Sequence, residues 1–302
     1  MRRRSVSQRR LCAASNRRAV WAELGLGLDL SAVNMPSILV FDIGNQHINI
    51  GVFDKDTLRA SWRISTRVEG TPDEYTVLLN TLQRQSERLQ QTTDAFEFEG
   101  GVIASSVPPM IPTFTELCRA QYGWTPLVVT AGVKTGIKIR TDNPREVGAD
   151  RVANALAAKT LHGAPAIIID FSPITIFDAV NSQGEYVGSA IAPGLNISAD
   201  ALFRSAAQLL RVELAPPESS SPIGKNTINA VRAGLIYGYV SMIEGMVARF
   251  KKELGQPARV IATGEQVSLV MSETRVVDEI DEHLTLRGLQ LIYNLNKRER
   301  IS

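Results

Sequence analysis

Two stretches of the chain share one hydrophobic pattern, a continuous apolar run that stops at an acidic turn. The first run covers residues 38–41 and stops at Asp42, and the second covers residues 166–169 and stops at Asp170. Four consecutive apolar residues before a turn are typical of a strand that is buried on both faces. The sequence therefore predicts two buried strands that each carry an aspartate at one end.

Each acidic turn is followed by two further segments whose apolar residues partly alternate. They are residues 48–53 and 58–65 after the first turn, and residues 176–180 and 186–191 after the second. Tight turns between such segments are typical of an antiparallel meander. The same unit of three strands is thus predicted twice, as a duplication of supersecondary structure rather than of sequence.

Helical spacing of apolar residues occupies much of the remaining chain. It predicts helices at residues 72–91, 112–122, 146–162, 198–211, 228–254 and 284–294, and short strands at 101–106 and 126–130. Thr71 and Pro72 are suited to the N-cap and first position of the first helix. The helix at 228–254 has a wide apolar stripe, and periodicity leaves open whether this stripe faces the core or a second copy of the chain.

Composition and charge exclude several functional classes. The chain has 302 residues, of which 44% are hydrophobic and 21% charged, as in ordinary globular proteins. It has no run of twenty apolar residues, so a membrane span is not expected. The formal charge of +2 depends on the first 34 residues, which hold seven of the 33 basic and two of the 31 acidic residues. The remainder has 26 basic and 29 acidic residues, or −3, and lacks a basic surface suited to nucleic acid.

Cysteine and histidine are too sparse to build a disulfide framework or a zinc site. Cys12 and Cys118 are the two cysteines, and the three histidines are His47, His162 and His283. A protein without a disulfide framework fits a reducing compartment, so we expect a cytoplasmic location.

The N-terminal segment 1–34 is predicted to lie outside the folded body, either disordered or not native. It is rich in Arg and poor in acidic residues, which resembles a transit peptide, but it lacks the apolar core of a secretory signal. An upstream start codon, with Met35 as the natural beginning, explains it equally well.

The paired acidic turns suggest nucleotide chemistry. A carboxylate at the end of a buried strand can approach a cation, and the backbone N–H groups of the following turn can approach phosphate. Magnesium needs only one or two carboxylates in addition to phosphate oxygens and waters, so Asp42 and Asp170 suffice. One acidic turn alone is more often structural than functional, whereas two matched turns are better evidence. The sequence has neither a P-loop nor a G-x-G-x-x-G motif.

Three further motifs make the chain resemble a known family. They are DNPREVGADR at residues 142–151, AIAPG at 190–194 and IGKNT at 223–227. Together with the acidic turns they resemble the type III pantothenate kinases, over residues 38–293. The resemblance implies an α/β protein with the two-lobed, duplicated fold of actin and ribonuclease H, in which helices flank mixed sheets. We expect an N-terminal lobe at residues 35–145 and a C-terminal lobe at 146–302.

The resemblance also implies an activity. Members of this family transfer phosphate from ATP to pantothenate, the first step of coenzyme A biosynthesis, and use Mg²⁺ and a monovalent cation (K⁺ or NH₄⁺). A homodimer with the acceptor site near the subunit interface is expected, with no role for nucleic acid or membrane.

Carried over residue by residue, the resemblance makes Asp150 the general base that accepts the proton of the pantothenate hydroxyl. Gly148, Ala149, Arg151 and Thr227 would form the rest of the acceptor site. From its chemistry, Arg151 is suited to pair with the pantothenate carboxylate. The alternative for Asp150 and Arg151 is an acid at a helix N-terminus beside a surface arginine.

The nucleotide site follows from the same resemblance. Asp42 and Asp170 would hold the cations, with the monovalent ion at Asp170. The residues at the nucleotide would be Asp42, Gly44, Asn45, Thr175 and Gly264.

The chain departs from the family pattern chiefly at this nucleotide site. The first motif of the family is Asp-x-Gly-Asn-Thr-Asn, and Gln46 and His47 replace its last two residues. Glu265 replaces the second Gly of the adenosine motif Ala-Thr-Gly-Gly, where a carboxylate is expected to clash with the nucleotide or repel it. On the acceptor side, Thr141 stands where a tyrosine is expected.

The second motif, Asp-Phe-Gly-Thr-Ala-Thr-Thr, is changed most. The replacements are Ser172, Pro173, Ile174 and Ile176. Pro173 removes a backbone donor and a hydroxyl from a turn that should face phosphate. Ser172 adds a Cβ, which is costly if the backbone φ is positive there. The loss of one donor to transition-state charge typically costs about 10²–10³ in rate, so these changes are expected to weaken or abolish turnover.

Three functional hypotheses follow. The first is a pantothenate kinase with weak activity or altered donor use. A subsidiary hypothesis is that Gln46 or the imidazole of His47 supplies donors that the second turn has lost. The second is a catalytically silent relative that binds pantothenate or a nucleotide, or acts through a protein partner. The third is a phosphohydrolase of the same superfamily, which nothing in the acceptor motifs recommends.

Overall fold

The computed structural model describes residues 37–89, 96–206, 211–215, 221–265 and 267–297. The predicted N-terminal extension, residues 1–34, lies outside these ranges. Pro36–Ser302 form one compact unit, so the lobe boundary predicted near residue 145 stays a prediction.

The first sheet contains the first predicted meander. Its strands are β1 (Ser37–Ile43), β2 (His47–Asp54), β3 (Thr57–Ser65), β4 (Phe98–Ser105) and β5 (Leu127–Val128), in the order β3-β2-β1-β4-β5. β1 pairs antiparallel with β2, and β2 with β3, whereas β4 and β5 run parallel to β1. The antiparallel meander predicted from alternation is confirmed.

The second sheet repeats this topology. Its strands are β6 (Ala166–Phe171), β7 (Ile174–Val180), β8 (Tyr186–Pro193), β9 (Arg259–Thr263) and β10 (Glu279–Ile280). Read from β8, the order is β8-β7-β6-β9-β10, which matches the first sheet strand for strand. The duplication is therefore confirmed, and Asp42 and Asp170 are the penultimate residues of the equivalent central strands β1 and β6.

The central strands are buried as their continuous apolar runs predict. Leu39, Val40 and Phe41 of β1 have no exposed surface, and neither do residues 167–169 of β6. A strand buried on both faces needs cover on each side, which the helices supply. β9 and β10 were not among the predicted strands; they have five and two residues, which is too short for a clear periodicity.

Two helices cover the outer face of the first sheet. They are α2 (Pro72–Leu89) and α3 (Met110–Tyr122), and the predicted helix start at Thr71 and Pro72 is observed. The Thr71 hydroxyl accepts from the Glu74 backbone N–H, and a Glu74 carboxylate oxygen accepts from the Thr71 N–H. This reciprocal capping box satisfies two backbone donors at the helix start.

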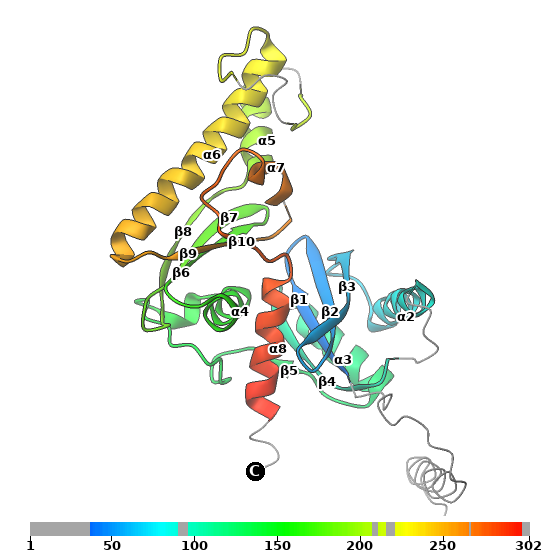
Figure 1. Cartoon of the computed structure of the whole chain (residues 1–302). Coiled ribbons are helices and arrows are strands. Elements are labelled where there is room, and N and C mark those ends of the chain that lie inside the picture. Colours follow the sequence, from blue (N-terminus) through cyan, green and yellow to red (C-terminus); the bar gives the residue numbers. More distant parts are fainter. Residues whose placement is uncertain (1–36, 90–95, 207–210, 216–220, 266, 298–302) are drawn as a thin grey trace, which may run out of the picture. The chain divides into compact units, whose positions relative to one another are not determined.

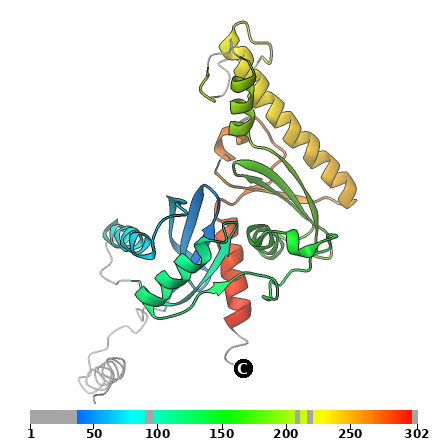
Figure 2. The ribbon, with the colours of Figure 1, turned by 180° about the vertical axis from the view of Figure 1, so that it is seen from behind.

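A helix pair lies between the two sheets. α4 (Ala149–Ala157) follows the short 3₁₀ helix Pro144–Glu146 and packs against α8 (Leu284–Lys297), which lies beside β1 in both views (Figures 1 and 2). Ala153 and Leu156 of α4 share a core with β1, β4 and α8, while Val152 and Ala155 share one with β6 and β9. Because α4 touches both cores, its N-terminal residues are carried to the region where the two sheets approach each other.

The long helix α6 (Thr227–Leu254) covers the second sheet. Its middle turns pack on the apolar residues of β6 and β9, with Ile236, Tyr239, Val240, Ile243 and Val247 buried. Its N-terminal end extends past the sheet beside α5 (Leu195–Ser205), whereas the short α7 (Val267–Met271) lies near β9 and β10 (Figure 1). Along the middle of the helix, the wide apolar stripe thus packs into the core. Within the described residues, no helix combines the length and apolar character that crossing a membrane requires.

Candidate active site

A cavity of about 850 Å³ lies between the two sheets, and three predicted aspartates line it. They are Asp42 from β1, Asp150 from α4 and Asp170 from β6. The same cavity is lined by the predicted nucleotide residues Gly44, Asn45 and Gly264. Two strand ends and one helix start therefore bring carboxylates that are distant in the sequence into one space.

Asp42 is held by its own sheet. Asn49 of β2, which pairs with Asp42 in the antiparallel ladder, donates a side-chain hydrogen bond of 3.1 Å to the Asp42 carboxylate. The pKa of Asp42 is raised to about 7, chiefly by burial and also by the nearby Asp150 and Asp170 carboxylates, while the Asn49 bond acts to lower it. Without a cation, Asp42 therefore keeps its proton to higher pH than an ordinary carboxyl does.

Asp170 occupies the equivalent position in the second sheet. Its pKa is raised to about 6, chiefly by burial, while the Ser172 hydroxyl, which donates a 2.6 Å hydrogen bond to Asp170 Oδ1, acts to lower it. Gly264 packs directly on this carboxylate with φ +95°; a Cβ there would lie 2.6 Å from Asp170 Oδ1 and 2.7 Å from the Phe171 N atom. Both the backbone angle and the space thus require glycine beside Asp170.

The two carboxylates have the chemistry of a cation site that a phosphate would complete. Within the described ranges, neither Asp42 nor Asp170 forms an ion pair with a basic side chain. In the same part of the chain, no group of three or more His, Cys, Asp or Glu side chains is arranged to hold a metal. Mg²⁺ commonly binds through one or two carboxylates with phosphate oxygens and waters, so the oxygen donors present fit this ion.

Asp150 sits in the first turn of α4. Gly148 is the N-cap of this helix, and a Cβ on Gly148 would lie only 2.3 Å from Asp150 Oδ1. The missing side chain thus leaves room for the Asp150 carboxylate to lie against the helix start. The partial positive charge of a helix N-terminus is a suitable environment for a carboxylate side chain.

Arg151 is held by the second sheet. Its Nε and Nη2 atoms donate to Asp178 Oδ1 of β7 at 3.1 and 2.7 Å, and the Tyr186 hydroxyl of β8 donates to the same oxygen at 2.7 Å. Asp178 and Tyr186 each have 1% of their surface exposed, and burial raises the pKa of Asp178 despite the Arg151 bonds. Arg151 lines the cavity and is therefore presented in one orientation by a buried network.

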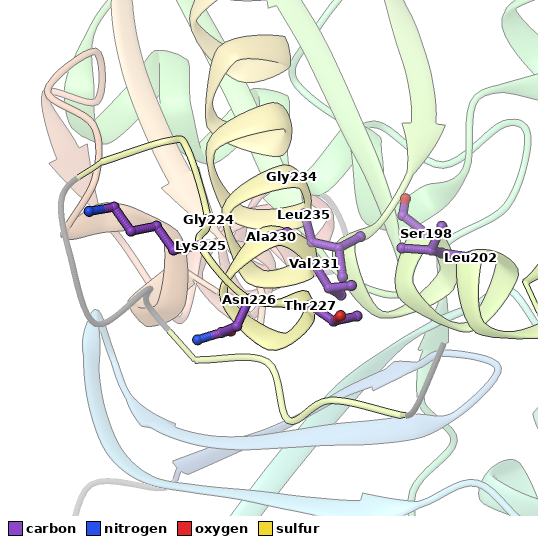
Figure 3. Close-up of a pocket in the computed structure, with 10 residues that line it drawn as sticks. All are labelled: Ser198, Leu202, Gly224, Lys225, Asn226, Thr227, Ala230, Val231, Gly234 and Leu235. Carbon is purple, nitrogen blue, oxygen red and sulfur yellow. The ribbon is translucent and has the colours of Figure 1, made fainter. Parts of the chain in front are cut away.

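Several predicted site residues do not line this cavity. Thr175 is fully buried and its hydroxyl is hydrogen-bonded to the Tyr239 hydroxyl of α6, while Gly148 and Ala149 precede Asp150 at the start of α4. Thr227 lines a second pocket, of about 750 Å³, between α5 and α6. Figure 3 shows Thr227 at the start of α6, across from Ser198 and Leu202. One chain by itself does not bring Thr227 to Asp150.

The second turn presents hydrocarbon to the cavity. Pro173, Ile174 and Ile176 line it together with Ile191 of β8. Ser172 is less costly than the sequence suggested, because its φ is not positive: in the described chain, Lys55 is the one non-glycine residue with positive φ. The Ser172 hydroxyl also donates a hydrogen bond to Asp170. The turn thus keeps its carboxylate but offers fewer polar groups than the first.

Glu265 is paired rather than isolated. Its Oε1 lies 2.7 Å from His47 Nδ1 of β2 and 3.5 Å from Arg63 Nη1 of β3, and all three residues line the cavity. Sequence reasoning missed Arg63, as well as the buried residues Asp178 and Tyr186 that hold Arg151. The alternation in β3 was a usable signal for Arg63. Asp178 lies in a mostly apolar strand, which was a signal for a buried polar role.

Two sheets of identical strand order, with an acidic cavity between them, define a duplicated two-lobed fold of the actin type. The profile of the type III pantothenate kinase family matches residues 38–249. A type III pantothenate kinase of Moorella thermoacetica is 44% identical over 259 residues, which cover 86% of this chain and 99% of the relative. That of Geotalea uraniireducens is 44% identical over 260 residues, with coverage of 86% and 99%.

The chain belongs to the type III pantothenate kinase family. Among solved structures, a protein described as a Baf family transcriptional activator from Campylobacter jejuni has a TM-score of 0.52 and 16% identity, and the match covers 86% of this chain and 99% of the other. At this identity the likeness concerns the fold alone.

Proposed function

We propose that the chain is a pantothenate kinase that transfers the γ-phosphate of ATP to the primary hydroxyl of pantothenate, the first step of coenzyme A biosynthesis. The observation that carries the proposal is the single cavity lined by Asp42, Asp150 and Asp170. Membership of the type III pantothenate kinase family supports the choice of substrates.

In the proposed step, Asp150 accepts the proton of the pantothenate hydroxyl while that oxygen forms a bond to the γ-phosphorus. The bond between this phosphorus and the bridging oxygen breaks, and ADP leaves with the bond's electron pair. Such transfer depends mainly on positioning and on stabilisation of charge, so a carboxylate at a helix start is an adequate base. Arg151, held by Asp178, is oriented to pair with the pantothenate carboxylate.

The nucleotide phosphates are proposed to lie near Asp42, Gly44 and Asn45 on the first sheet and Gly264 on the second. Asp42 and Asp170 would hold Mg²⁺ and a monovalent cation such as K⁺ or NH₄⁺, with the monovalent ion at Asp170. Bound cations would offset the negative charge of phosphate beside these carboxylates. Thr175, as a buried residue bonded to Tyr239, would support the second turn from behind.

The test is to incubate the chain with pantothenate, ATP, Mg²⁺ and K⁺ and to measure phosphopantothenate by mass spectrometry. Product that disappears in Asp150→Asn supports the proposal. Absence of product from the folded chain under these conditions contradicts it.

We further propose a homodimer in the cytoplasm, in which Thr227 reaches the acceptor site of the partner copy. Supporting this, Thr227 lies outside the cavity of its own chain, and large apolar residues are exposed on neighbouring segments, including Ile197 (40%), Ile223 (78%) and Ile228 (48%). The free, buried thiol of Cys118 agrees with a reducing compartment. Mixing Asp150→Asn and Thr227→Ala chains tests the arrangement, since heterodimers would contain one intact site and exceed the summed activity of the separate variants.

A catalytically silent relative is the second candidate. The apolar lining of the second turn and the paired Glu265 favour it, because both alter the side of the cavity where the donor is proposed to bind. Calorimetry distinguishes the two functions: pantothenate binding without ATP binding and without product supports the silent relative.

A further inference from the structure

Two of the departures from the family pattern meet in space. His47 begins β2 in the first sheet, and Glu265 follows β9 in the second, yet His47 Nδ1 and Glu265 Oε1 are 2.7 Å apart. Arg63 Nη1 of β3 lies 3.5 Å from the same oxygen. The substitutions at residues 47 and 265 are therefore parts of one contact across the cavity.

His47 and Arg63 belong to a polar face of the first sheet. Asp42 pairs with Asn49, and Asn49 pairs with Arg63, so these three residues form a row across the strands. His47 is two residues before Asn49 and therefore projects from the same face. The imidazole and guanidinium groups give this face N–H donors that suit an anion.

Glu265 is directed at this pair from the opposite sheet. It follows Gly264, whose φ of +95° and close packing on Asp170 and Phe171 fix the path of the chain. A carboxylate and a phosphate oxygen are bound by the same donors in similar geometry, so Glu265 uses donors that a phosphate in this cavity would need.

We propose that His47 and Arg63 form an anion subsite for a phosphate group of the nucleotide, and that Glu265 occupies this subsite until the donor displaces it. The inference rests on the proposed use of a phosphate donor in this cavity. It makes Glu265 a residue that sets the affinity for the donor, rather than a residue that only repels it.

The exposure of the three side chains makes displacement feasible. The side chains of His47, Glu265 and Arg63 are 34%, 26% and 51% exposed. Ion pairs in contact with solvent contribute little to stability, so opening this one costs little. Once displaced, the donors remain on the strands β2 and β3, whose ladder holds their spacing.

The experiment measures equilibrium binding of the Mg²⁺ complex of the β,γ-imido analogue of ATP by calorimetry, without pantothenate. Glu265→Gln keeps the size of the side chain and removes its charge. We expect it to bind the analogue up to about fivefold more tightly than the unchanged chain, because a carboxylate that competes with phosphate for these donors is lost. Adding His47→Ala to Glu265→Gln should remove most of that gain.

Glu282→Gln is the matched control. Glu282 also lines the cavity, but among the described contacts it is not paired with His47 or Arg63. A gain for Glu265→Gln that clearly exceeds the gain for Glu282→Gln supports displacement, whereas equal gains mean a general effect of charge and overturn the inference. Thermal melting of each variant establishes that it is folded.

Failure of the inference and failure of the proposed function are separable. If the unchanged chain makes phosphopantothenate but Glu265→Gln gains no affinity, the function stands and the subsite is overturned. If Glu265→Gln binds the analogue more tightly while no variant makes product, the subsite stands and the kinase proposal fails. Weaker binding by a folded Glu265→Gln chain would show that Glu265 supports the nucleotide and would also overturn the inference.

Discussion

The two halves of the cavity have the same strand order and different chemistry. The first sheet offers polar side chains in a row, with Asp42, Asn49 and Arg63 on adjacent strands. The second offers Asp170 beside Pro173 and isoleucines, and two buried polar residues of that sheet, Asp178 and Tyr186, hold Arg151. The duplicated backbone therefore positions two equivalent aspartates, while the side chains around them differ between the two sheets.

The largest expected effect is at Asp150, where the two halves converge. Asp150→Asn should lower phosphorylation of pantothenate by about 10²–10⁴-fold, since the proton acceptor is lost while the shape is kept. Product formation measured by mass checks this. Asp142→Asn is the matched control, since Asp142 lies on the same segment but not in the cavity, and equal losses in the two variants would contradict the role of Asp150.

The next effect tests whether the second sheet serves the acceptor. Asp178→Asn should raise KM for pantothenate by about tenfold with a smaller change in kcat, because Arg151 loses charge-assisted hydrogen bonds that orient it. Tyr186→Phe removes one hydrogen bond to Asp178 and keeps the ring, so its effect should have the same sign and be smaller. Steady-state kinetics with pantothenate and ATP varied in turn provide the measurement. A change confined to the KM for ATP would contradict the proposal that the second sheet serves the acceptor.

The raised pKa values predict how cation binding depends on pH. With pKa values of about 7 for Asp42 and about 6 for Asp170, protons compete with a divalent cation at higher pH than at ordinary carboxylates. Affinity for Mg²⁺ should therefore fall as pH drops from 8 to 6, by up to about tenfold per pH unit for each proton displaced. Calorimetric titrations at several pH values check it, and Asp42→Asn should flatten the part of the profile near pH 7.

The same pKa shifts predict the direction in which the stability of the cation-free protein changes with pH. A carboxyl whose pKa is higher in the folded than in the unfolded state stabilises the fold below its unfolded pKa, and this contribution is lost as pH rises through the folded value. In the presence of a chelator, the contribution of Asp42 and Asp170 to the free energy of unfolding should thus decline between about pH 4 and pH 7. Melting curves in which Asp42→Asn removes part of this decline would support the assignment.

The smallest expected effect concerns Ser172. Its hydroxyl donates to Asp170 and lowers the pKa of that carboxyl, so Ser172→Ala should raise the pKa and weaken cation binding near neutral pH by about threefold. Ser172→Gly should behave alike, because φ at this position is not positive and glycine has no backbone strain to relieve. Different results for the two variants would indicate that the turn changes conformation.

Much of the fold could be predicted from local patterns. The apolar runs ending at Asp42 and Asp170 mark central strands, and alternation marks the two strands after each. β9 was not predicted because it has only five residues, and its place beside β6 depends on a parallel pairing of segments that are distant in the sequence. Thr227 was assigned to the acceptor site by motif, but its place between α5 and α6 depends on helix packing that no local pattern encodes.

By itself, the sequence determined the repeated three-strand unit, the matched aspartates and the motif at Asp150, because each is expressed in neighbouring residues. Only the tertiary structure decided that Glu265 meets His47 and Arg63, that Asp178 and Tyr186 hold Arg151, and that Thr175 is buried against Tyr239. The physical reason is that these contacts join strands and helices far apart in the chain. Their side chains become neighbours only when sheet register and helix packing place them there.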